Sequence, residues 1–316
     1  MLQEFDLIER HFKPLCKDNP GMILGMGDDA ALLNIPPNET LAISTDTLIA
    51  GTHFPFETSP EDIAYKALMV NASDLAAMGA APRWFLLALT LPDSNPVWLN
   101  AFAKGLADAL ESVQAVLIGG DTTKGPLSIT IQALGTLQGK ALLRSGAKVG
   151  DLIFVTGKLG AAAFALTPEG KQNAAAQTAL NRPQARWRQG KILQRFASSA
   201  IDVSDGLAQD LGHVLKASGV GAQIFLKDVP IAECLTNDIC PDSLELALSG
   251  GDDYELLCTL SPENVESAKS AFLKENMALF QIGTIVEKQG LNFIKENGEH
   301  FLPDKLGYDH FRSDGK

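Results

Sequence analysis

Short β-rich runs alternate with helix signals along this 316-residue chain, and the alternation limits what the chain can fold into. Ser or Asn followed by Pro is typical of a helix start, and it predicts helices over 59–78, 95–113 and 261–274. Runs rich in β-branched, aromatic and other apolar residues predict strands between them. The predicted strands are 41–45, 84–91, 115–118, 127–137, 152–156, 222–226, 255–260 and 278–286. The pattern predicts a mixed fold of helices and strands without a tandem repeat.

The length predicts two domains, at roughly 150 residues per domain. Residues 139–150 are rich in Gly and Lys and have the character of a connector, so we predict domains over 1–139 and 140–316. The polar, alanine-rich segment 167–182 is predicted to be a surface loop or a helix end. Hydrophobic residues make up 46% of the chain and charged residues 20%, which excludes a disordered chain and a coiled coil.

The chain is acidic: 38 Asp and Glu against 26 Lys and Arg give a net charge of −12. This balance predicts that neither nucleic acid nor an anionic membrane is a partner, because both select basic surfaces. The acidic start MLQEFD and the shortness of the most apolar run, 84–91, predict neither export nor a membrane span. The four cysteines form no C-x-x-C pair, so we expect free, buried thiols and a cytoplasmic location.

Six short motifs place aspartates beside Gly, Ser or Thr, just after apolar runs. They are GMGDDAA at 25–31, STDT at 44–47, NASDL at 71–75, GGDTT at 119–123, IDVSDG at 201–206 and SGGDDYE at 249–255. Any one of these aspartates alone could close a turn or cap a helix. Together they offer compact oxygen ligands of the kind with which Mg²⁺ links carboxylates to substrate phosphates. The six motifs therefore predict a magnesium-dependent enzyme that acts on phosphates.

Other catalytic motifs are absent from the sequence, including the P-loop, the H-R-D and D-F-G elements of protein kinases, H-E-x-x-H and G-x-S-x-G. One alternative of another class remains. Residues 25–30 fit G-x-G-x-x-A, and Asp46 follows at the spacing typical of a dinucleotide-binding oxidoreductase. Asp28 and Asp29 count against this alternative, because they would place two negative charges where a pyrophosphate binds.

The motifs occur in an order that resembles the thiamine-monophosphate kinase family, of the aminoimidazole ribonucleotide synthetase superfamily. The resemblance runs from EFDLIERHF at 4–12, through RSGAKVGD at 144–151, to GYDHF at 307–311. It implies ATP-dependent phosphorylation of thiamine monophosphate to thiamine diphosphate by direct in-line transfer of the γ-phosphoryl group. An ATP-dependent cyclo-ligase of the aminoimidazole ribonucleotide synthetase type is the enzymatic alternative. A structural or regulatory protein that binds divalent metals is the non-enzymatic one.

The resemblance also implies a fold and a set of site residues. The fold would be α/β and α+β in two domains, with an N-terminal mixed sheet that forms a dimer barrel and a C-terminal α+β sandwich-like domain. The implied ligands of several Mg²⁺ ions are Asp29, Ser44, Thr45, Asp46, Asp74, Asp121, Asp202 and Asp205. The implied ATP-binding residues are Gly120, Asp121, Arg144 and Ser204, and the implied thiamine monophosphate-binding residues are His53, Asp252 and Tyr308. Asp46, Asp121 and Arg144 would act in catalysis.

Overall fold

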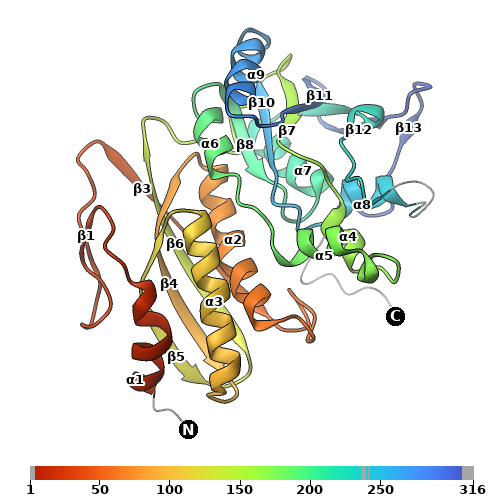
Figure 1. Ribbon diagram of the computed structural model, residues 1–316. Helices are drawn as coiled ribbons and strands as arrows, with labels where there is room; N and C mark the ends of the chain where they lie inside the picture. Colours follow the sequence, from red (N-terminus) through yellow and green to blue (C-terminus); the bar gives the residue numbers. More distant parts are fainter. Residues whose placement is uncertain (1–3, 236–239, 241, 308–316) are drawn as a thin grey trace. The chain divides into compact units, whose positions relative to one another are not determined.

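The computed structural model describes residues 4–235, 240 and 242–307, and the chain divides into two compact units (Figure 1). The first unit comprises residues 1–76 and 80–141, and the second comprises 77–79 and 142–316. Each unit has its own mixed sheet and its own apolar core. The chain is therefore a two-domain protein of mixed helices and strands, as its length and the alternating pattern predict.

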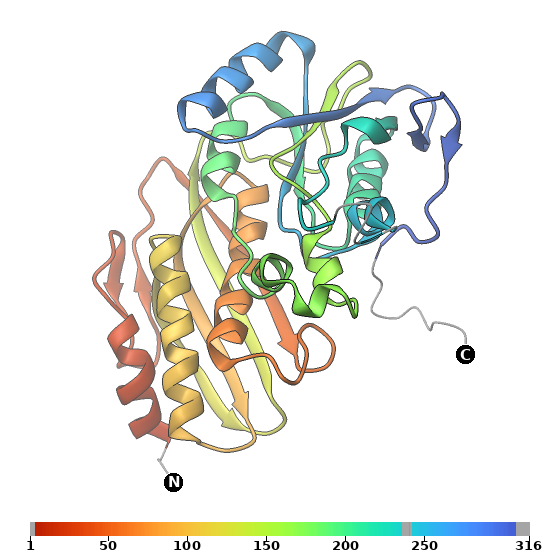
Figure 2. The same ribbon diagram turned by 45° about the vertical axis from the view of Figure 1, so that its right-hand side comes forward.

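In its described residues, the first unit contains a four-stranded sheet with two helices, α2 (Pro60–Ala77) and α3 (Pro96–Ser112), along one face (Figures 1 and 2). The strands lie in the order β3 (Glu39–Ile49), β6 (Ser128–Gln138), β4 (Ala81–Leu91) and β5 (Val116–Lys124). The pairs β3–β6 and β6–β4 are antiparallel and β4–β5 is parallel. The strands β3 and β5 are thus the two edges of this sheet.

Local capping explains where the two helices begin. The Ser59 hydroxyl accepts a hydrogen bond from the Asp62 backbone N–H at the start of α2. The Asn95 side chain accepts from the N–H groups of Val97 and Trp98 at the start of α3. The predicted helices over 59–78 and 95–113 are therefore confirmed. In the predicted helix over 261–274, a 3₁₀ turn at Pro262–Asn264 precedes α9 (Val265–Lys274).

The other face of this sheet is covered at one end by an N-terminal segment. Strands β1 (Met22–Leu24) and β2 (Leu32–Leu33) form a hairpin that packs against the buried Trp84. Before the hairpin, the chain forms α1 (Glu4–Leu7) and a π-helical turn at Ile8–Phe12. The hairpin was not predicted, because its strands are too short for an alternating pattern to show.

The second unit contains a seven-stranded sheet in the described part of the chain. Its order is β13 (His300–Phe301), β12 (Gly290–Ile294), β9 (Gly221–Phe225), β11 (Phe280–Val286), β7 (Leu152–Val155), β10 (Leu256–Leu260) and β8 (Ala197–Asp202). The pair β12–β9 is parallel and the other pairs are antiparallel. Helices α7 (Leu207–Ser218) and α8 (Ser243–Ser249) contribute to the core that packs on this sheet.

Short elements account for the differences between prediction and structure. The segment 167–182 contains a 3₁₀ turn at Gly170–Gln172 and the Asn173-capped helix α5 (Ala174–Asn181), so its description as a loop or helix end was incomplete. The helices α4 (Ala161–Ala165) and α6 (Trp187–Leu193) were not predicted, because elements of five and seven residues carry little periodicity. Residues 139–150, all of them described, contain turns and neither helix nor strand.

Two further predictions can be compared with the fold. The four cysteines, all within the described residues, are free thiols; Cys240 and Cys258 are buried, whereas Cys16 and Cys234 are partly exposed. Among the described residues, no helix combines the length and the apolar character that crossing a membrane requires.

Candidate active site

Three of the expected metal ligands meet between strand β3 and helix α2. The Ser44 hydroxyl donates a hydrogen bond to a carboxylate oxygen of Asp74. Asp46 lies two residues after Ser44 on the same face of β3, and its backbone N–H donates to the side-chain oxygen of Asn71 at 2.9 Å. Asn71 is fully buried and lies one turn before Asp74 in α2. The motifs STDT and NASDL therefore come together, although they are far apart in sequence.

The electrostatics of this group suit a cation. Burial and the neighbouring Asp74 carboxylate raise the pKa of Asp46 from 3.8 to about 6. Two carboxylates and one hydroxyl form an oxygen-only donor set, which is the kind that Mg²⁺ prefers. A divalent cation would remove the repulsion between the two acids, so the residues present fit the magnesium site that the sequence implies.

Other expected residues of the first unit are placed differently. The Thr45 hydroxyl donates to the carbonyl oxygen of Ile131 at 3.0 Å, and its side chain lies on the opposite face of β3 from its two neighbours. The structure thus does not bring the Thr45 side chain to Asp46. His53 lies in the turn after β3, where its Nδ1 accepts from the Ile49 backbone N–H at 3.0 Å. Asp29 is exposed in the segment between β1 and β2.

The GGD motif forms part of the edge strand β5. Gly120 has φ +152°, and a Cβ atom there would lie 1.9 Å from the carbonyl oxygen of Leu87, so this position requires glycine. Asp121 is exposed on the next position of the strand. Since β6 and β4 separate the edges β3 and β5, Asp121 and Asp46 are about three strand spacings, or roughly 14 Å, apart. The first unit alone does not bring these two acids together.

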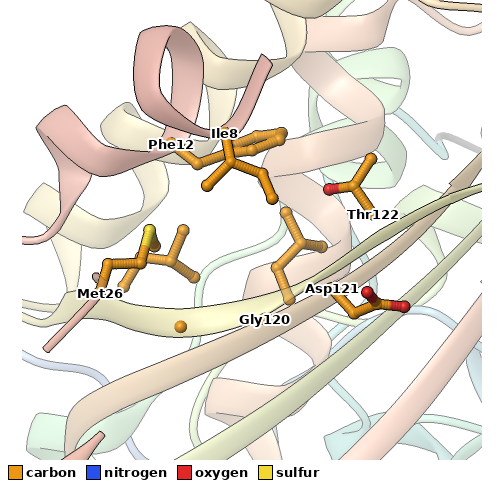
Figure 3. A pocket seen from close by; sticks show the side chains of 9 residues that line it. Ile8, Phe12, Met26, Gly120, Asp121 and Thr122 are labelled. Carbon is orange, nitrogen blue, oxygen red and sulfur yellow. The ribbon is translucent and has the colours of Figure 1, made fainter. Parts of the chain in front are cut away.

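A small cavity lies beside the GGD motif (Figure 3). Figure 3 shows Ile8 and Phe12 of the N-terminal segment above the strand that carries Gly120 and Asp121. The cavity volume is about 30 Å³, which is room for about two water molecules and too little for a nucleobase. In this arrangement it is therefore a packing gap beneath the N-terminal segment.

In the second unit, the motifs IDVSDG and SGGDDYE lie against each other. The Asp252 backbone N–H donates to the Ser204 carbonyl oxygen, and the Tyr254 N–H donates to that of Val203, each at 2.8 Å. The Tyr254 hydroxyl donates to an Asp252 carboxylate oxygen at 2.8 Å. Asp252 and Tyr254 have φ +68° and +51°, a left-handed conformation that is uncommon for residues other than glycine. These contacts hold Asp252 beside the backbone of Ser204.

Acidic side chains cluster at the end of strand β8. Asp202 is buried at the last position of the strand, and Asp205 follows in the loop that leads to α7. Asp210, an acid that the motifs do not include, is buried in the first turn of α7. Burial, then the nearby Asp202 and Asp205, raise the pKa of Asp210 to about 8. This second group of close carboxylates again fits a bound cation.

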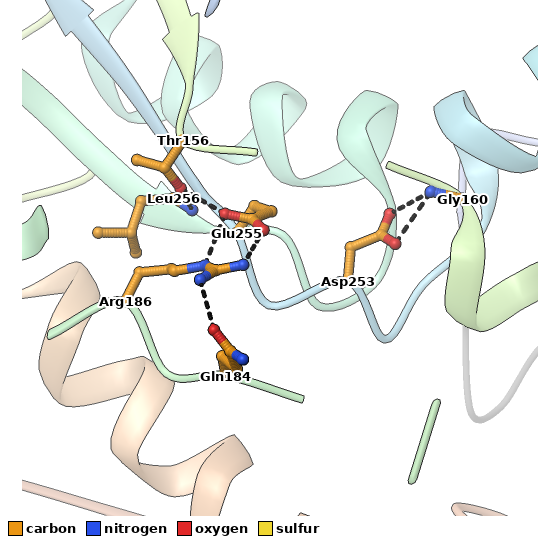
Figure 4. A network of polar contacts seen from close by, with 7 residues as sticks. All are labelled: Thr156, Gly160, Gln184, Arg186, Asp253, Glu255 and Leu256. Carbon is orange, nitrogen blue, oxygen red and sulfur yellow. Dashed lines mark hydrogen bonds and ion pairs between the residues drawn. The ribbon is translucent and has the colours of Figure 1, made fainter. Parts of the chain in front are cut away.

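The two acids after Asp252 have structural partners (Figure 4). The buried Glu255 carboxylate accepts from the Arg186 Nε at 2.9 Å, from another guanidinium nitrogen of Arg186 at 2.5 Å and from the Thr156 hydroxyl at 2.7 Å. Asp253 accepts from the Gly160 backbone N–H through both carboxylate oxygens, at 2.9 and 3.0 Å. Sequence reasoning missed the contribution of Arg186, since no local pattern links it to a residue 69 positions away.

The remaining expected residues are Arg144 and Tyr308. Arg144 is exposed in a turn, and its carbonyl oxygen accepts from the Ser218 hydroxyl at 3.4 Å. The same hydroxyl accepts from the backbone N–H groups of Gly146 and Ala147, so Ser218 fixes the turn that carries Arg144. Tyr308 lies outside the described residues.

Comparison with known proteins decides the family. Residues 27–137 match the family model "AIR synthase related protein, N-terminal domain", and residues 148–296 match "AIR synthase related protein, C-terminal domain". The chain is 48% identical to the thiamine-monophosphate kinase of Escherichia coli (strain K12), over 98% of both chains. This chain belongs to the thiamine-monophosphate kinase family.

Solved structures of the thiamine-monophosphate kinase family have the same fold. The enzyme from Stenotrophomonas maltophilia K279a is 40% identical, with a TM-score of 0.85 over 94% of this chain and 98% of that one. A structure described as "AaThiL complexed with AMPPCP and TMP" is 30% identical, with a TM-score of 0.76 over 98% and 97% of the two chains.

The alternative that this chain is a dinucleotide-binding oxidoreductase is wrong. In a dinucleotide-binding fold, the glycine-rich turn joins a strand to a helix whose N-terminus binds the pyrophosphate. Here the residues 25–30 join β1 to the short strand β2, and no helix follows within this described segment. The G-x-G-x-x-A match is therefore a coincidence of a turn sequence.

Proposed function

We propose that this chain transfers the γ-phosphoryl group of ATP to thiamine monophosphate, forming thiamine diphosphate and ADP. The observation that carries the proposal is the 48% identity to a thiamine-monophosphate kinase over nearly the whole of both chains. A second support is the relative whose structure contains AMPPCP and TMP, because the structural match covers 97% of that relative's chain.

The two groups of carboxylates would hold several Mg²⁺ ions. Ser44, Asp46 and Asp74 form one group, and Asp202 and Asp205 belong to the other. Bound magnesium would neutralise the negative charge of the two phosphates that must approach each other. The exposed Asp29 and Asp121 and the backbone of Thr45 are further candidate ligands in the proposal.

The reaction needs no covalent enzyme intermediate. An ionised oxygen of the thiamine monophosphate phosphate attacks the γ-phosphorus in line, and the bond to the β–γ bridging oxygen breaks, so that ADP leaves with the electron pair. Since the attacking oxygen is already ionised near neutral pH, no strong general base is required. Arg144 offers a planar fork of N–H donors to ATP phosphate oxygens, and Gly120 and Ser204 complete the proposed ATP contacts. His53, Asp252 and Tyr308 are the proposed contacts to thiamine monophosphate.

A coupled assay with two acceptors tests the function. The protein is incubated with ATP and Mg²⁺, and with either thiamine monophosphate or formylglycinamidine ribonucleotide, and the products are separated by chromatography. We expect thiamine diphosphate and ADP in equal amounts from the first mixture, and no turnover in the second. Turnover with formylglycinamidine ribonucleotide alone would establish the cyclo-ligase instead, and absence of turnover in both would favour a non-enzymatic metal-binding protein.

We further propose a homodimer formed through the uncovered part of the first unit's sheet, consistent with the dimer barrel that the resemblance implies. Ile43 and Ile49 lie on the edge strand β3, on the face opposite Ser44 and Asp46, and are 56% and 45% exposed. An edge strand with exposed apolar side chains favours association with another chain.

Replacing Ile43 by Lys should convert the dimer into a monomer, because a second copy would have to bury the ammonium group. Size-exclusion chromatography with light scattering gives the mass. Val97→Lys is the matched control, since Val97 is 77% exposed at the start of α3, on the helical side of the sheet. A wild-type mass of one chain, or an Ile43→Lys variant that stays dimeric at micromolar concentration, would contradict this interface.

The proposed location is the cytoplasm. The four free thiols, two of them partly exposed, suit a reducing compartment. The ATP that the proposed reaction consumes is available there.

A further inference from the structure

One carboxylate oxygen organises the loop between β8 and α7. Asp210 Oδ2 accepts hydrogen bonds from three consecutive backbone N–H groups: Ser204 at 3.0 Å, Asp205 at 3.0 Å and Gly206 at 3.1 Å. Asp210 itself is only 2% exposed. An acid in the first turn of a helix commonly interacts with the N–H groups of its own helix. Here it binds the loop that precedes the helix.

The same loop is also fixed from its other side. The Ser204 carbonyl oxygen accepts from the Asp252 N–H at 2.8 Å. Gly206 has φ +122°, and a Cβ atom there would lie 2.9 Å from the backbone carbon of Ser249, so the loop packs directly on the SGGDDYE segment. The loop is therefore held from two sides, by Asp210 through three N–H groups and by the SGGDDYE segment through the Ser204 carbonyl oxygen.

We propose that Asp210 is a positioning residue, which fixes the loop 204–206 so that Ser204 and Asp205 are preorganised to bind magnesium and nucleotide. The inference rests on the proposed function, because that function gives these two residues their ligands. A cation bound beside Asp210 would favour its ionised form, and charge-assisted bonds from N–H to carboxylate are about twice as strong as neutral ones, so an acid would then hold the loop better than an amide. Partners of ligand residues typically contribute 10- to 100-fold to metal affinity or activity.

Other groups near the Asp210 carboxylate are acidic or titratable. Asp202 and Asp205 lie close enough to raise the pKa of Asp210. One side-chain ligand atom each of Asp205, Asp210 and His213 lie within 4.8 Å of one another. A direct role of Asp210 as a metal ligand is therefore the alternative that the experiment must separate. The three N–H groups on Oδ2 favour the positioning role.

The test compares Asp210→Asn with Asp151→Asn in the full-length protein. Asp151 is an equally buried acid of the second unit, and its carboxylate accepts from the Lys148 backbone N–H at 3.0 Å, in the turn 148–151 and not in the loop 204–206. Three quantities are measured for each variant: amide hydrogen exchange at 204–206 by NMR, the Kd for Mg²⁺ with AMPPCP by calorimetry, and kcat and KM. Asp210→Ala, which removes the acceptor altogether, is the stronger variant if it folds.

We expect Asp210→Asn to speed exchange of the three loop amides and to weaken Mg²⁺–AMPPCP binding by about 10-fold or more. Asp151→Asn should leave the loop amides and the binding unchanged, even if the two variants melt at similar temperatures. If the loop amides of Asp210→Asn exchange at the wild-type rate but the variant binds fewer Mg²⁺ ions per chain, the proposal is overturned in favour of Asp210 as a direct metal ligand. Wild-type binding in Asp210→Asn, or an equal loss in Asp151→Asn, would overturn it in favour of a purely structural role.

Failure of the proposed function gives a different result. In that case wild-type protein does not phosphorylate thiamine monophosphate, whatever the variants do. Faster amide exchange and weaker Mg²⁺–AMPPCP binding in Asp210→Asn would still support the positioning role.

Discussion

The Asp46→Asn variant should lose thiamine monophosphate phosphorylation by ~10²–10³-fold while remaining folded, and saturating Mg²⁺ should not restore the rate. The amide keeps the shape of the side chain, and the backbone N–H bond to Asn71 does not depend on the carboxylate. The substitution removes one of the two negative charges that we propose to hold magnesium between β3 and α2. Asp121→Asn, on the opposite edge strand, should produce a loss of the same order.

The stability of the metal-free protein should change in the opposite direction to activity. Because the folded-state pKa of Asp46 is raised from 3.8 to about 6, ionising this group destabilises the fold as pH rises between these values. The full penalty is present at pH 7, and Asn does not carry it. We therefore expect Asp46→Asn without metal to melt at or above the wild-type temperature at pH 7. Added Mg²⁺ should raise its melting temperature less than that of the wild type.

Asp93→Asn provides the control for the loss of an acid. Asp93 lies in an exposed loop of the same unit, where its carboxylate accepts from the Asn95 N–H. This variant should keep the wild-type rate. If either Asp46→Asn or Asp121→Asn retains the wild-type rate with saturating Mg²⁺, the assignment is wrong.

The second large effect is expected from Arg186→Ala, which should lower the free energy of unfolding of the second unit by ~3–5 kcal/mol. Glu255 is buried, and Arg186 supplies two of the hydrogen bonds to its carboxylate. Without the guanidinium, the remaining Thr156 hydroxyl cannot compensate a buried charge. Urea unfolding followed by circular dichroism measures the loss.

An exposed ion pair of the same unit calibrates this measurement. Lys158 and Glu233 are 2.7 Å apart, but their side chains are 42% and 87% exposed, so Lys158→Ala should lower the free energy of unfolding far less than Arg186→Ala. The double variant Arg186→Met with Glu255→Leu should recover most of the stability, because it leaves no charge buried alone. Equal losses from Arg186→Ala and Lys158→Ala would show that the buried pair is not special.

Much of the fold could be predicted because its signals are local. Ser-Pro and Asn-Pro mark the starts of α2 and α3, since the capping side chain and the N–H groups it binds lie within three residues. The long strand β6 also shows in a single run of sequence. The strand β8 was missed, although it carries Asp202. Its sequence ASSAID is short and consists mostly of small side chains, so it shows no strand pattern.

The site was predictable to a different extent. The order of the aspartate motifs was sufficient to identify the family, because family membership depends on residue types and spacing alone. Pairings between motifs were not predictable: Ser44 meets Asp74 across 30 positions, and Asp252 meets Ser204 across 48. The direction of the Thr45 side chain and the loop-holding role of Asp210 were also absent from the motifs, since both follow from how strands and helices pack.

The sequence by itself determined the family, the acid-rich chemistry and the main helices and strands. These properties depend on residue identity, on spacing and on hydrogen bonds between near neighbours. The tertiary structure alone decided which acids share an environment and which backbone loops they hold. The physical reason is that burial and repulsion between carboxylates depend on distance in space, so the raised pKa values of Asp46 and Asp210 exist only once β3 and α2, and β8 and α7, have packed.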